Sequence, residues 1–276
     1  MNKKDLIKFF DKISKNYAKE YYGNISDLIR EKTYEEVVKI IKSFEEKNKE
    51  IEILEAGCGN GWLTSKLLKF KNTKITAVDF SKGMLKELKN RLKKDHKKEY
   101  YQIKKRLKTI NQDLTKLKLK EKFDLIILIN VLTNVKNNKE VITIIKNLSK
   151  FLKEKSFLII SIENKNSFLG LSFILRNINN NSQKYIVRAY HINLIKKYLK
   201  KINLNIEKII RIKIKQNYLK LNLKPKNIIN KIKIMIKDKK EFKQTLKFIL
   251  IKTLIELDKI LKINEGYLIV GKCKGK

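Results

Sequence analysis

Residues 51–61 read Ile-Glu-Ile-Leu-Glu-Ala-Gly-Cys-Gly-Asn-Gly, and this stretch decides the fold. An apolar run typical of a strand leads into Glu55, and residues 62–68, directly after the stretch, have helical spacing. Between the two, glycine occupies alternate positions, namely Gly57, Gly59 and Gly61. A strand, a glycine turn and a helix in this order bring bare backbone against a ligand. The stretch therefore predicts a ligand-binding turn in an α/β fold.

The next strand-like run, residues 74–78, ends at Asp79, which lies twenty residues beyond Gly59. An acid at about this offset reaches the ribose hydroxyls of a nucleotide-like ligand. A dinucleotide site would also need a third glycine at position 62, where the helix packs close to the strand. This chain has Trp62 there. The spacing therefore predicts a nucleotide-like ligand and argues against a dinucleotide.

The pattern Glu-x-Gly-x-Gly-x-Gly from Glu55 onward resembles motif I of the class I S-adenosylmethionine-dependent methyltransferases, which have a Rossmann-like fold. Later segments resemble further motifs of that family in the same order. They are Val78 to Leu85, which has an Asp, a Ser and a Met at the start of a helix; Asn111 to Leu114, an acidic loop; and Phe123 to Ile129, a strand. The resemblance covers about residues 10–163.

The segment Phe10-Asp11-Lys12-Ile13, with Tyr17 after it, is similar to the opening helix of small-molecule methyltransferases of the quinone-biosynthesis type. The family resemblance implies S-adenosylmethionine as the cofactor. It also implies a set of binding positions at the carboxyl ends of the strands, where an open parallel sheet holds its ligand. These positions are Glu55, Gly57, Cys58, Gly59, Gly61, Asp79, Phe80, Met84, Asp113, Leu114 and Asn130.

Short β-rich runs alternate with amphipathic segments from residue 51 to 163, and such alternation indicates a parallel sheet with right-handed crossovers. We expect a doubly wound α/β fold with a mostly parallel, seven-stranded sheet and helices on both faces. Residues 1–50 are expected to form an N-terminal helical cap and 51–163 the cofactor-binding core. Residues 164–276 are expected to complete the sheet with a helical insertion before an antiparallel last strand. The three parts are expected to form one globular unit.

The sequence does not identify a general base or a metal site. Glu163 ends the fifth predicted strand and faces either the pocket or solvent, whereas His96 and His191 are expected to be solvated. The stretch Asn130-Val131-Leu132-Thr133 lacks the prolines that methyltransferases of amino groups in nucleic acids carry after the fourth strand. Neither of the two cysteines, Cys58 and Cys273, lies in a Pro-Cys motif of the kind that cytosine C5 methyltransferases need.

The formal net charge of +38 permits binding to nucleic acid. However, only six of the 66 basic residues are arginine, and lysine is spread over nearly every predicted helix. Abundant Lys, Ile and Asn are typical of AT-rich codon usage, and charge runs are usually solvated faces. Nucleic-acid binding is therefore possible but not favoured. With two cysteines, no apolar leader and no apolar run of membrane-spanning length, the sequence predicts a cytoplasmic protein.

These observations favour a methyltransferase that acts on a small-molecule acceptor. Two alternatives stay open, an RNA methyltransferase of the same fold and a non-catalytic subunit that binds the cofactor and works through a partner. The identity of the acceptor, the atom that is methylated and the oligomeric state do not follow from the sequence.

Overall fold

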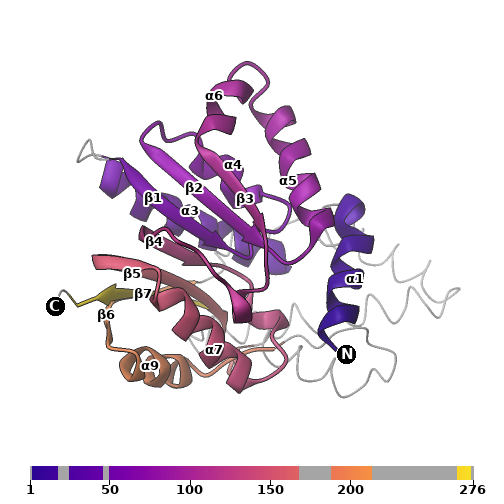
Figure 1. Ribbon diagram of the computed structural model, residues 1–276. Coiled ribbons are helices and arrows are strands. Elements are labelled where there is room, and N and C mark those ends of the chain that lie inside the picture. The colour runs from indigo at the N-terminus through magenta and orange to yellow at the C-terminus, as the bar shows by residue number, and fades with distance from the viewer. Residues whose placement is uncertain (1, 18–24, 46–49, 168–187, 213–265, 275–276) are drawn as a thin grey trace, which may run out of the picture.

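The computed structural model describes residues 2–17, 25–45, 50–167, 188–212 and 266–274. These residues form a seven-stranded sheet with the strand order β3-β2-β1-β4-β5-β7-β6 (Figure 1). The strands are β1 (Ile51–Ala56), β2 (Thr73–Asp79), β3 (Leu107–Asn111), β4 (Phe123–Leu128), β5 (Leu152–Glu163), β6 (Leu204–Ile212) and β7 (Gly266–Cys273).

The sheet reverses its winding direction between β1 and β4. Strand β1 pairs in parallel with β2 on one side and with β4 on the other, and β3 and β5 extend the two halves in parallel. The last strand, β7, runs antiparallel to both β5 and β6. The predicted seven-stranded, mostly parallel sheet is therefore confirmed, and the crevice at its switch point lies at the carboxyl ends of β1 and β4.

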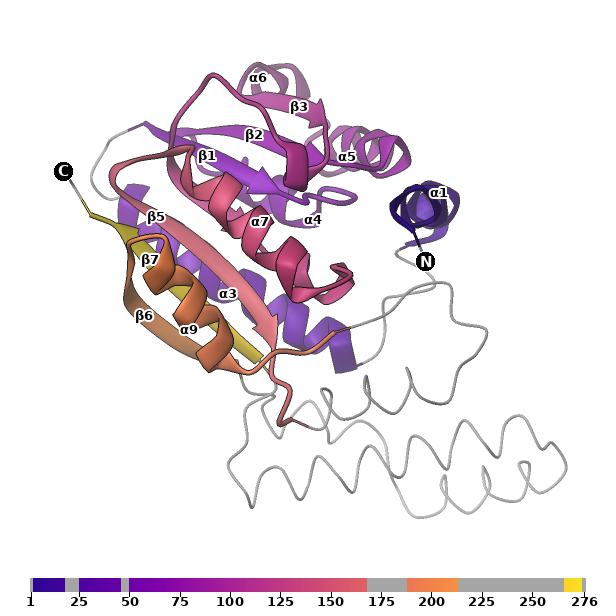
Figure 2. The same cartoon turned by 60° about the horizontal axis from the view of Figure 1, so that its bottom comes forward.

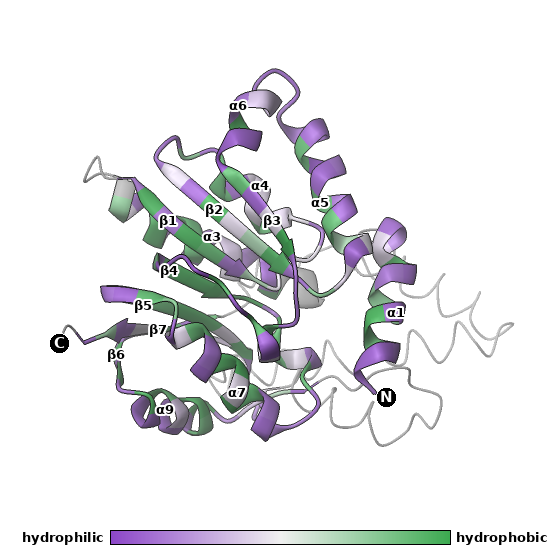
Figure 3. Ribbon diagram, in the orientation of Figure 1, coloured by the Kyte–Doolittle hydropathy of each residue, from purple (hydrophilic) through white to green (hydrophobic). Residues whose placement is uncertain are grey.

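Helices cover both faces of the sheet, as predicted. One apolar core lies between the sheet and α7 (Asn138–Ser149) and α9 (Ile192–Lys201), and the other lies between the sheet and α3 (Ile25–Glu45), α4 (Trp62–Leu67) and α5 (Lys82–Asp95). Figure 2 shows α7 and α9 on the side of the sheet opposite α3. Hydrophobic residues line the central strands, and polar residues occupy the outward turns of the helices (Figure 3).

The remaining described helices are α1 (Lys3–Ile13), α6 (Tyr100–Lys105) and the short 3-10 turns η1 (Ser14–Asn16), η2 (Leu114–Lys116) and η3 (Leu132–Asn134). The sequence did not predict α6, whereas β5 ends at Glu163 as predicted. None of the helices in the described ranges combines the length and apolar character needed to cross a bilayer. The helical insertion predicted before the last strand lies outside the described residues, and the predicted three-part division stays a prediction.

Candidate functional site

The glycine turn is held in a left-handed backbone conformation. Gly57, Gly59 and Gly61 have φ values of 75°, 54° and 75°, a region that side chains with a Cβ rarely adopt. The amides of Gly57 and Cys58 both donate to the carbonyl of Val78, at 2.7 and 3.0 Å, so the turn is tied to the end of β2. The turn is therefore a fixed backbone feature at the switch point of the sheet.

The three glycines have different surroundings. A Cβ on Gly57 would lie 2.3 Å from Cγ2 of Val131, and a Cβ on Gly61 would lie 2.5 Å from Cγ of Leu88. A Cβ on Gly59 would meet no atom within 4 Å. Gly57 and Gly61 are therefore required by packing within the protein. Gly59 alone presents bare backbone to open space, which is the arrangement that admits a ligand against the turn.

Glu55 lies at the end of β1, directly before the turn, and is buried with a relative exposure of 4%. Its Oε2 accepts a hydrogen bond of 2.6 Å from the hydroxyl of Thr64 in α4. Burial raises the pKa of Glu55 to about 8; the bond from Thr64 lowers the pKa and the nearby charge of Asp79 raises it. Glu55 is thus a carboxyl group that is largely protonated at neutral pH unless a positive charge is bound beside it.

Asp79 ends β2 and contacts the glycine turn directly. Its Oδ2 accepts from the amide of Gly59 and its Oδ1 from the amide of Ser81, both at 2.9 Å. Burial raises the pKa of Asp79 to about 6; the amides of Ser81 and Gly59 lower the pKa and the charge of Asp11 raises it. The acid predicted to hold the ribose is therefore fixed against the one glycine that faces open space.

Asp113 follows β3 at the same edge of the sheet. Its side chain caps η2 by accepting from the amide and hydroxyl of Thr115, at 2.8 and 2.9 Å, and it pairs with Lys3 of α1 at 2.5 Å. Partial burial raises the pKa of Asp113, but the bonds from Lys3 and Thr115 outweigh it and hold the pKa below its ordinary value. The predicted adenine-contacting acid is thus charged and already engaged by the N-terminal helix.

The other predicted positions surround this centre. Phe80 stacks edge-to-face on Phe10 of α1 with ring centroids 5.7 Å apart, whereas Met84, Leu114 and Cys58 are buried. Burial raises the pKa of the Cys58 thiol well above its ordinary value. Asn130 follows β4 with a φ of 57°, and its amide donates to the hydroxyl of Ser161 at 2.8 Å. The roles of all eleven positions in cofactor binding stay predictions.

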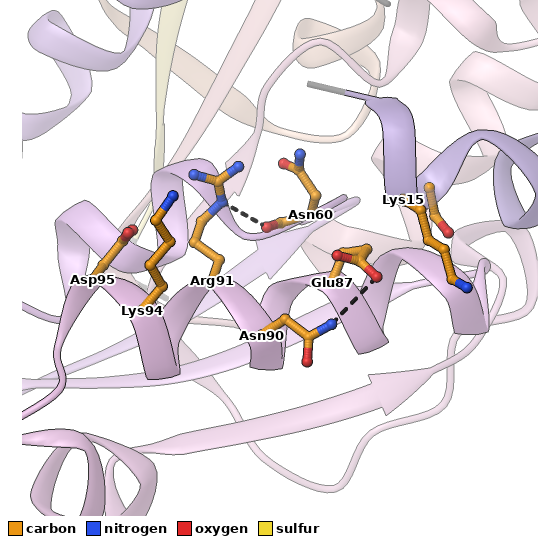
Figure 4. Close-up of a pocket in the computed structure, with 8 residues that line it drawn as sticks. Lys15, Asn60, Glu87, Asn90, Arg91, Lys94 and Asp95 are labelled. Atoms are coloured by element: carbon orange, nitrogen blue, oxygen red, sulfur yellow. Dashed lines mark hydrogen bonds between the residues drawn. The ribbon is translucent and has the colours of Figure 1, made fainter. Parts of the chain in front are cut away.

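A cavity of about 220 Å³ lies beside the turn, between Asn60, η1 and the outer side of α5 (Figure 4). Arg91 and Lys94 project from α5 on the same side in this view. Nε of Arg91 donates to the carbonyl of Asn60 at 3.0 Å, and its guanidinium lies 4.6 Å from the ring centre of Trp62. The lining also includes the carboxylates of Glu87 and Asp95, so the cavity is polar and of mixed charge.

The structure corrects one expectation about the possible general bases and decides a placement that the sequence left open. His96 was expected to be solvated, but only 7% of it is exposed and its Nε2 lies 3.0 Å from the hydroxyl of Ser65. Glu163 is buried rather than on the surface, whereas His191 is exposed as expected. Sequence reasoning missed the contacts of Lys3 and Asp11, because both residues bind partners about 70 or more positions away. Among the described residues no His, Cys, Asp and Glu side chains gather as a metal site.

Comparison with known proteins agrees with this geometry. Residues 53–155 match the family model of a methyltransferase domain. The malonyl-[acyl-carrier protein] O-methyltransferase of Priestia megaterium is 34% identical over 128 residues, which is 46% of this chain and 40% of that protein. The protein of the same name from Bacillus cereus is 30% identical over 131 residues, or 46% of this chain and 42% of the relative. The chain thus matches about two fifths of the length of these curated relatives.

Among solved structures, magnesium protoporphyrin IX methyltransferase from Synechocystis PCC 6803 with bound S-adenosylhomocysteine superposes with a TM-score of 0.61 and 20% identity. The superposition covers 77% of this chain and 94% of that one. At this identity the likeness establishes the fold. Residues 53–155, which include the glycine turn, β2 and β4, are thus similar to a methyltransferase domain, and the described residues have a Rossmann-like fold.

Proposed function

We propose that this chain is an S-adenosylmethionine-dependent methyltransferase, and that its acceptor is a carboxylate oxygen of an acyl group carried on an acidic carrier protein. The observation that supports cofactor binding most directly is the open backbone at Gly59, with the carboxylate of Asp79 fixed 2.9 Å from its amide nitrogen. Bare backbone beside a buried acid suits a nucleoside that carries hydroxyl groups.

The residues present fit this cofactor. The turn at Gly57–Gly61 would hold its amino-acid end, Asp79 its ribose and Asp113 its adenine amino group. When bound, S-adenosylmethionine supplies a methyl group that its sulfonium already activates. The protein's part is then to orient the acceptor and to exclude water. Glu55 and Asp79, the two buried carboxyl groups at the turn, would provide negative charge opposite a positively charged ligand.

A carboxylate acceptor needs no general base, and the sequence does not identify one. A carboxyl group with an ordinary pKa near 4 has already lost its proton at neutral pH, so its transfer reaction needs no general base. A carrier-linked acyl group is further supported by the names of the curated relatives. The net charge of +38 would attract an acidic carrier protein and speed its association.

The decisive experiment is transfer of a labelled methyl group from S-adenosylmethionine. The purified protein is incubated with malonyl-loaded acyl-carrier protein, with free malonate and with transfer RNA. We expect label on the carrier-bound acyl group as a base-labile ester. Asp79→Ala should abolish most of this transfer, and Glu154→Ala, at an exposed position on β5, should not. Label in RNA alone, or no label with any acceptor, would contradict the proposed function.

We place this activity in the cytoplasm. Both cysteines, Cys58 and Cys273, are free thiols, which is consistent with a reducing compartment. Fractionation of cells that produce the chain, followed by immunodetection, would test the location.

A further inference from the structure

Helix α1 contacts the rest of the molecule through polar groups and through the ring of Phe10, which packs on Phe80. It contains no buried residue, and yet it lies beside the first turn of α5 in both views (Figures 1 and 2). The contact is close because residue 83 is a glycine. A Cβ on Gly83 would lie 2.7 Å from Oγ of Ser14 and 3.0 Å from the backbone of Asp11. The sequence thus allows α1 to approach the start of α5 at this one point.

Asp11 occupies the contact and caps α5 from a different helix. Its Oδ1 accepts from the hydroxyl of Ser81 at 2.6 Å and from the amide of Gly83 at 2.8 Å. The first amides of a helix lack partners within the helix, and negative charge is favourable at that end. Ser81 is the N-cap of α5 and accepts from the amide of Met84 at 3.0 Å. The single hydroxyl proton of Ser81 is therefore directed at Asp11.

Ser81 continues the chain of hydrogen bonds from Asp11 into the predicted cofactor site. The backbone amide of Ser81 donates to Oδ1 of Asp79, and Oδ2 of Asp79 accepts from the amide of Gly59. An unbroken path therefore runs from Asp11 through Ser81 and Asp79 to the glycine that faces open space. Residues 11 and 81 are 70 positions apart, so only the folded chain creates this path.

We propose that Asp11 is a positioning residue, which holds the Ser81 turn and thereby orients the carboxylate of Asp79 towards the bound nucleoside. This inference rests on the proposed function, because it concerns the same cofactor. In this proposal Asp11 acts through Ser81 and Gly83 and not on the reacting atoms. It acts by fixing the backbone that donates to Asp79, and its own charge lies close enough to Asp79 to oppose ionisation there.

The first test measures the affinity for S-adenosylhomocysteine by calorimetry. Asp11→Ala should weaken binding by about tenfold, the usual effect of losing a charge-assisted hydrogen bond. Asp11→Asn retains an acceptor oxygen for Ser81 and Gly83 and should recover most of the affinity. The matched control is Asp5→Ala, which removes an exposed charge from the same helix and should bind like the wild type.

The second test separates positioning from a merely structural role through the pH profile of binding. The ionisable groups around Asp79 are Asp11 on α1, Glu55 on β1 and the thiol of Cys58 in the turn. Removing the charge of Asp11 lowers the pKa of Asp79. The loss of affinity at acid pH, near pH 6 in the wild type, should therefore move to lower pH in Asp11→Asn. A helix that only became looser would weaken binding equally at every pH. The pKa of Glu55, about 8, lies above the acid range in which the two proteins are compared.

A double-mutant cycle completes the design. If Asp11 acts through Ser81, the losses from Asp11→Ala and Ser81→Ala should be less than additive in the double variant. Wild-type protein that fails to bind S-adenosylhomocysteine would contradict the proposed function and this inference together. Wild-type protein that binds, with Asp11→Ala binding as tightly as Asp5→Ala, would overturn the role of Asp11 alone. Additive losses in the cycle, or an unshifted acid limb in Asp11→Asn, would also overturn it.

Discussion

Glu55 and Asp79 are buried carboxyl groups at the ends of neighbouring strands. The charge of Asp79 raises the pKa of Glu55, and both carboxyl groups raise the pKa of the Cys58 thiol. Burying a carboxylate is unfavourable unless hydrogen bonds or a positive charge compensate it. Glu55 has one hydrogen-bond donor, Thr64, and Asp79 has two backbone amides. A cationic ligand at the turn would supply the missing compensation, so we expect a trade between the stability of the free protein and ligand binding at these residues.

This trade predicts a pH dependence of stability. Glu55 has a pKa of about 8 in the folded protein against 4.5 ordinarily, so between these values the folded state binds more protons than the unfolded chain. The free energy of unfolding therefore falls as the pH rises through this window, and Asp79 adds to the fall up to about pH 6. In Glu55→Gln, the melting temperature should fall less between about pH 5 and pH 8 and exceed that of the wild type at the upper end. Glu154→Gln is the exposed control, and equal slopes in all three proteins would contradict the prediction.

Asp113 gives a second prediction at the residue scale. We expect its carboxylate to accept from the adenine amino group, an interaction of about 1.5–3 kcal/mol for a charged acceptor. Wild-type protein should therefore bind S-adenosylhomocysteine more tightly than its inosine analogue, which lacks that amino group. Asp113→Ala should lose this preference, whereas Lys3→Ala, which removes only the ion-pair partner, should keep it. Unchanged discrimination in Asp113→Ala would place the adenine contact elsewhere.

At the scale of elements, α4 and α5 are joined by a buried polar contact. The hydroxyl of Ser65 donates to Oδ2 of Asp95 at 2.7 Å, and Nε2 of His96 lies 3.0 Å from both the hydroxyl and the carbonyl of Ser65. The two helices are also close at Gly61, the N-cap of α4, where a Cβ would clash with Leu88 of α5. Helix α4, which follows the glycine turn, is thus positioned by α5, which follows Asp79.

This contact predicts a loss of stability without a loss of binding. Ser65→Ala removes the hydroxyl that donates to Asp95 and contacts His96, although the carbonyl of residue 65 still contacts the histidine nitrogen. The variant should lower the free energy of unfolding by about 1–3 kcal/mol, measured by urea denaturation. The control is Ser43→Ala, because Ser43 makes only an exposed bond to the carbonyl of Ile40. Affinity for S-adenosylhomocysteine should be the same in both variants. A urea midpoint for Ser65→Ala equal to that of Ser43→Ala would show that the contact contributes nothing.

At the scale of the whole molecule, the charge of +38 permits RNA binding, so the affinity for RNA distinguishes a small-molecule enzyme from an RNA enzyme. If the excess lysine reflects composition, RNA binding is non-specific, with a dissociation constant of about 10⁻⁴–10⁻⁶ M at physiological salt and a steep dependence on salt. Filter binding of transfer RNA at about 150 mM salt measures this. Tight, saturable binding accompanied by methylation of the RNA would favour the alternative function.

The glycine turn, the helix caps and the alternation of strands and helices follow from local sequence, whereas α6 was not predicted. The positive φ values of the three glycines, and the side chains of Ser81 and Asn137 that accept from amides three residues ahead, are local features. Neighbouring residues suffice to produce them, so a pattern of residues reveals them. The alternation of strands and helices likewise restricts the sheet to a parallel, right-handed arrangement.

The pairing of distant polar groups depends on the folded chain. Asp11 with Ser81, Lys3 with Asp113 and Ser65 with His96 join residues 70, 110 and 31 positions apart. No local preference favours these pairs. The first two pairs form because the sheet brings the carboxyl ends of β2 and β3 to one edge, where α1 lies. The third pair forms because packing buries His96, at the end of α5, against Ser65 of α4. The physical reason is that a buried or capping polar group takes the partner that folding places beside it.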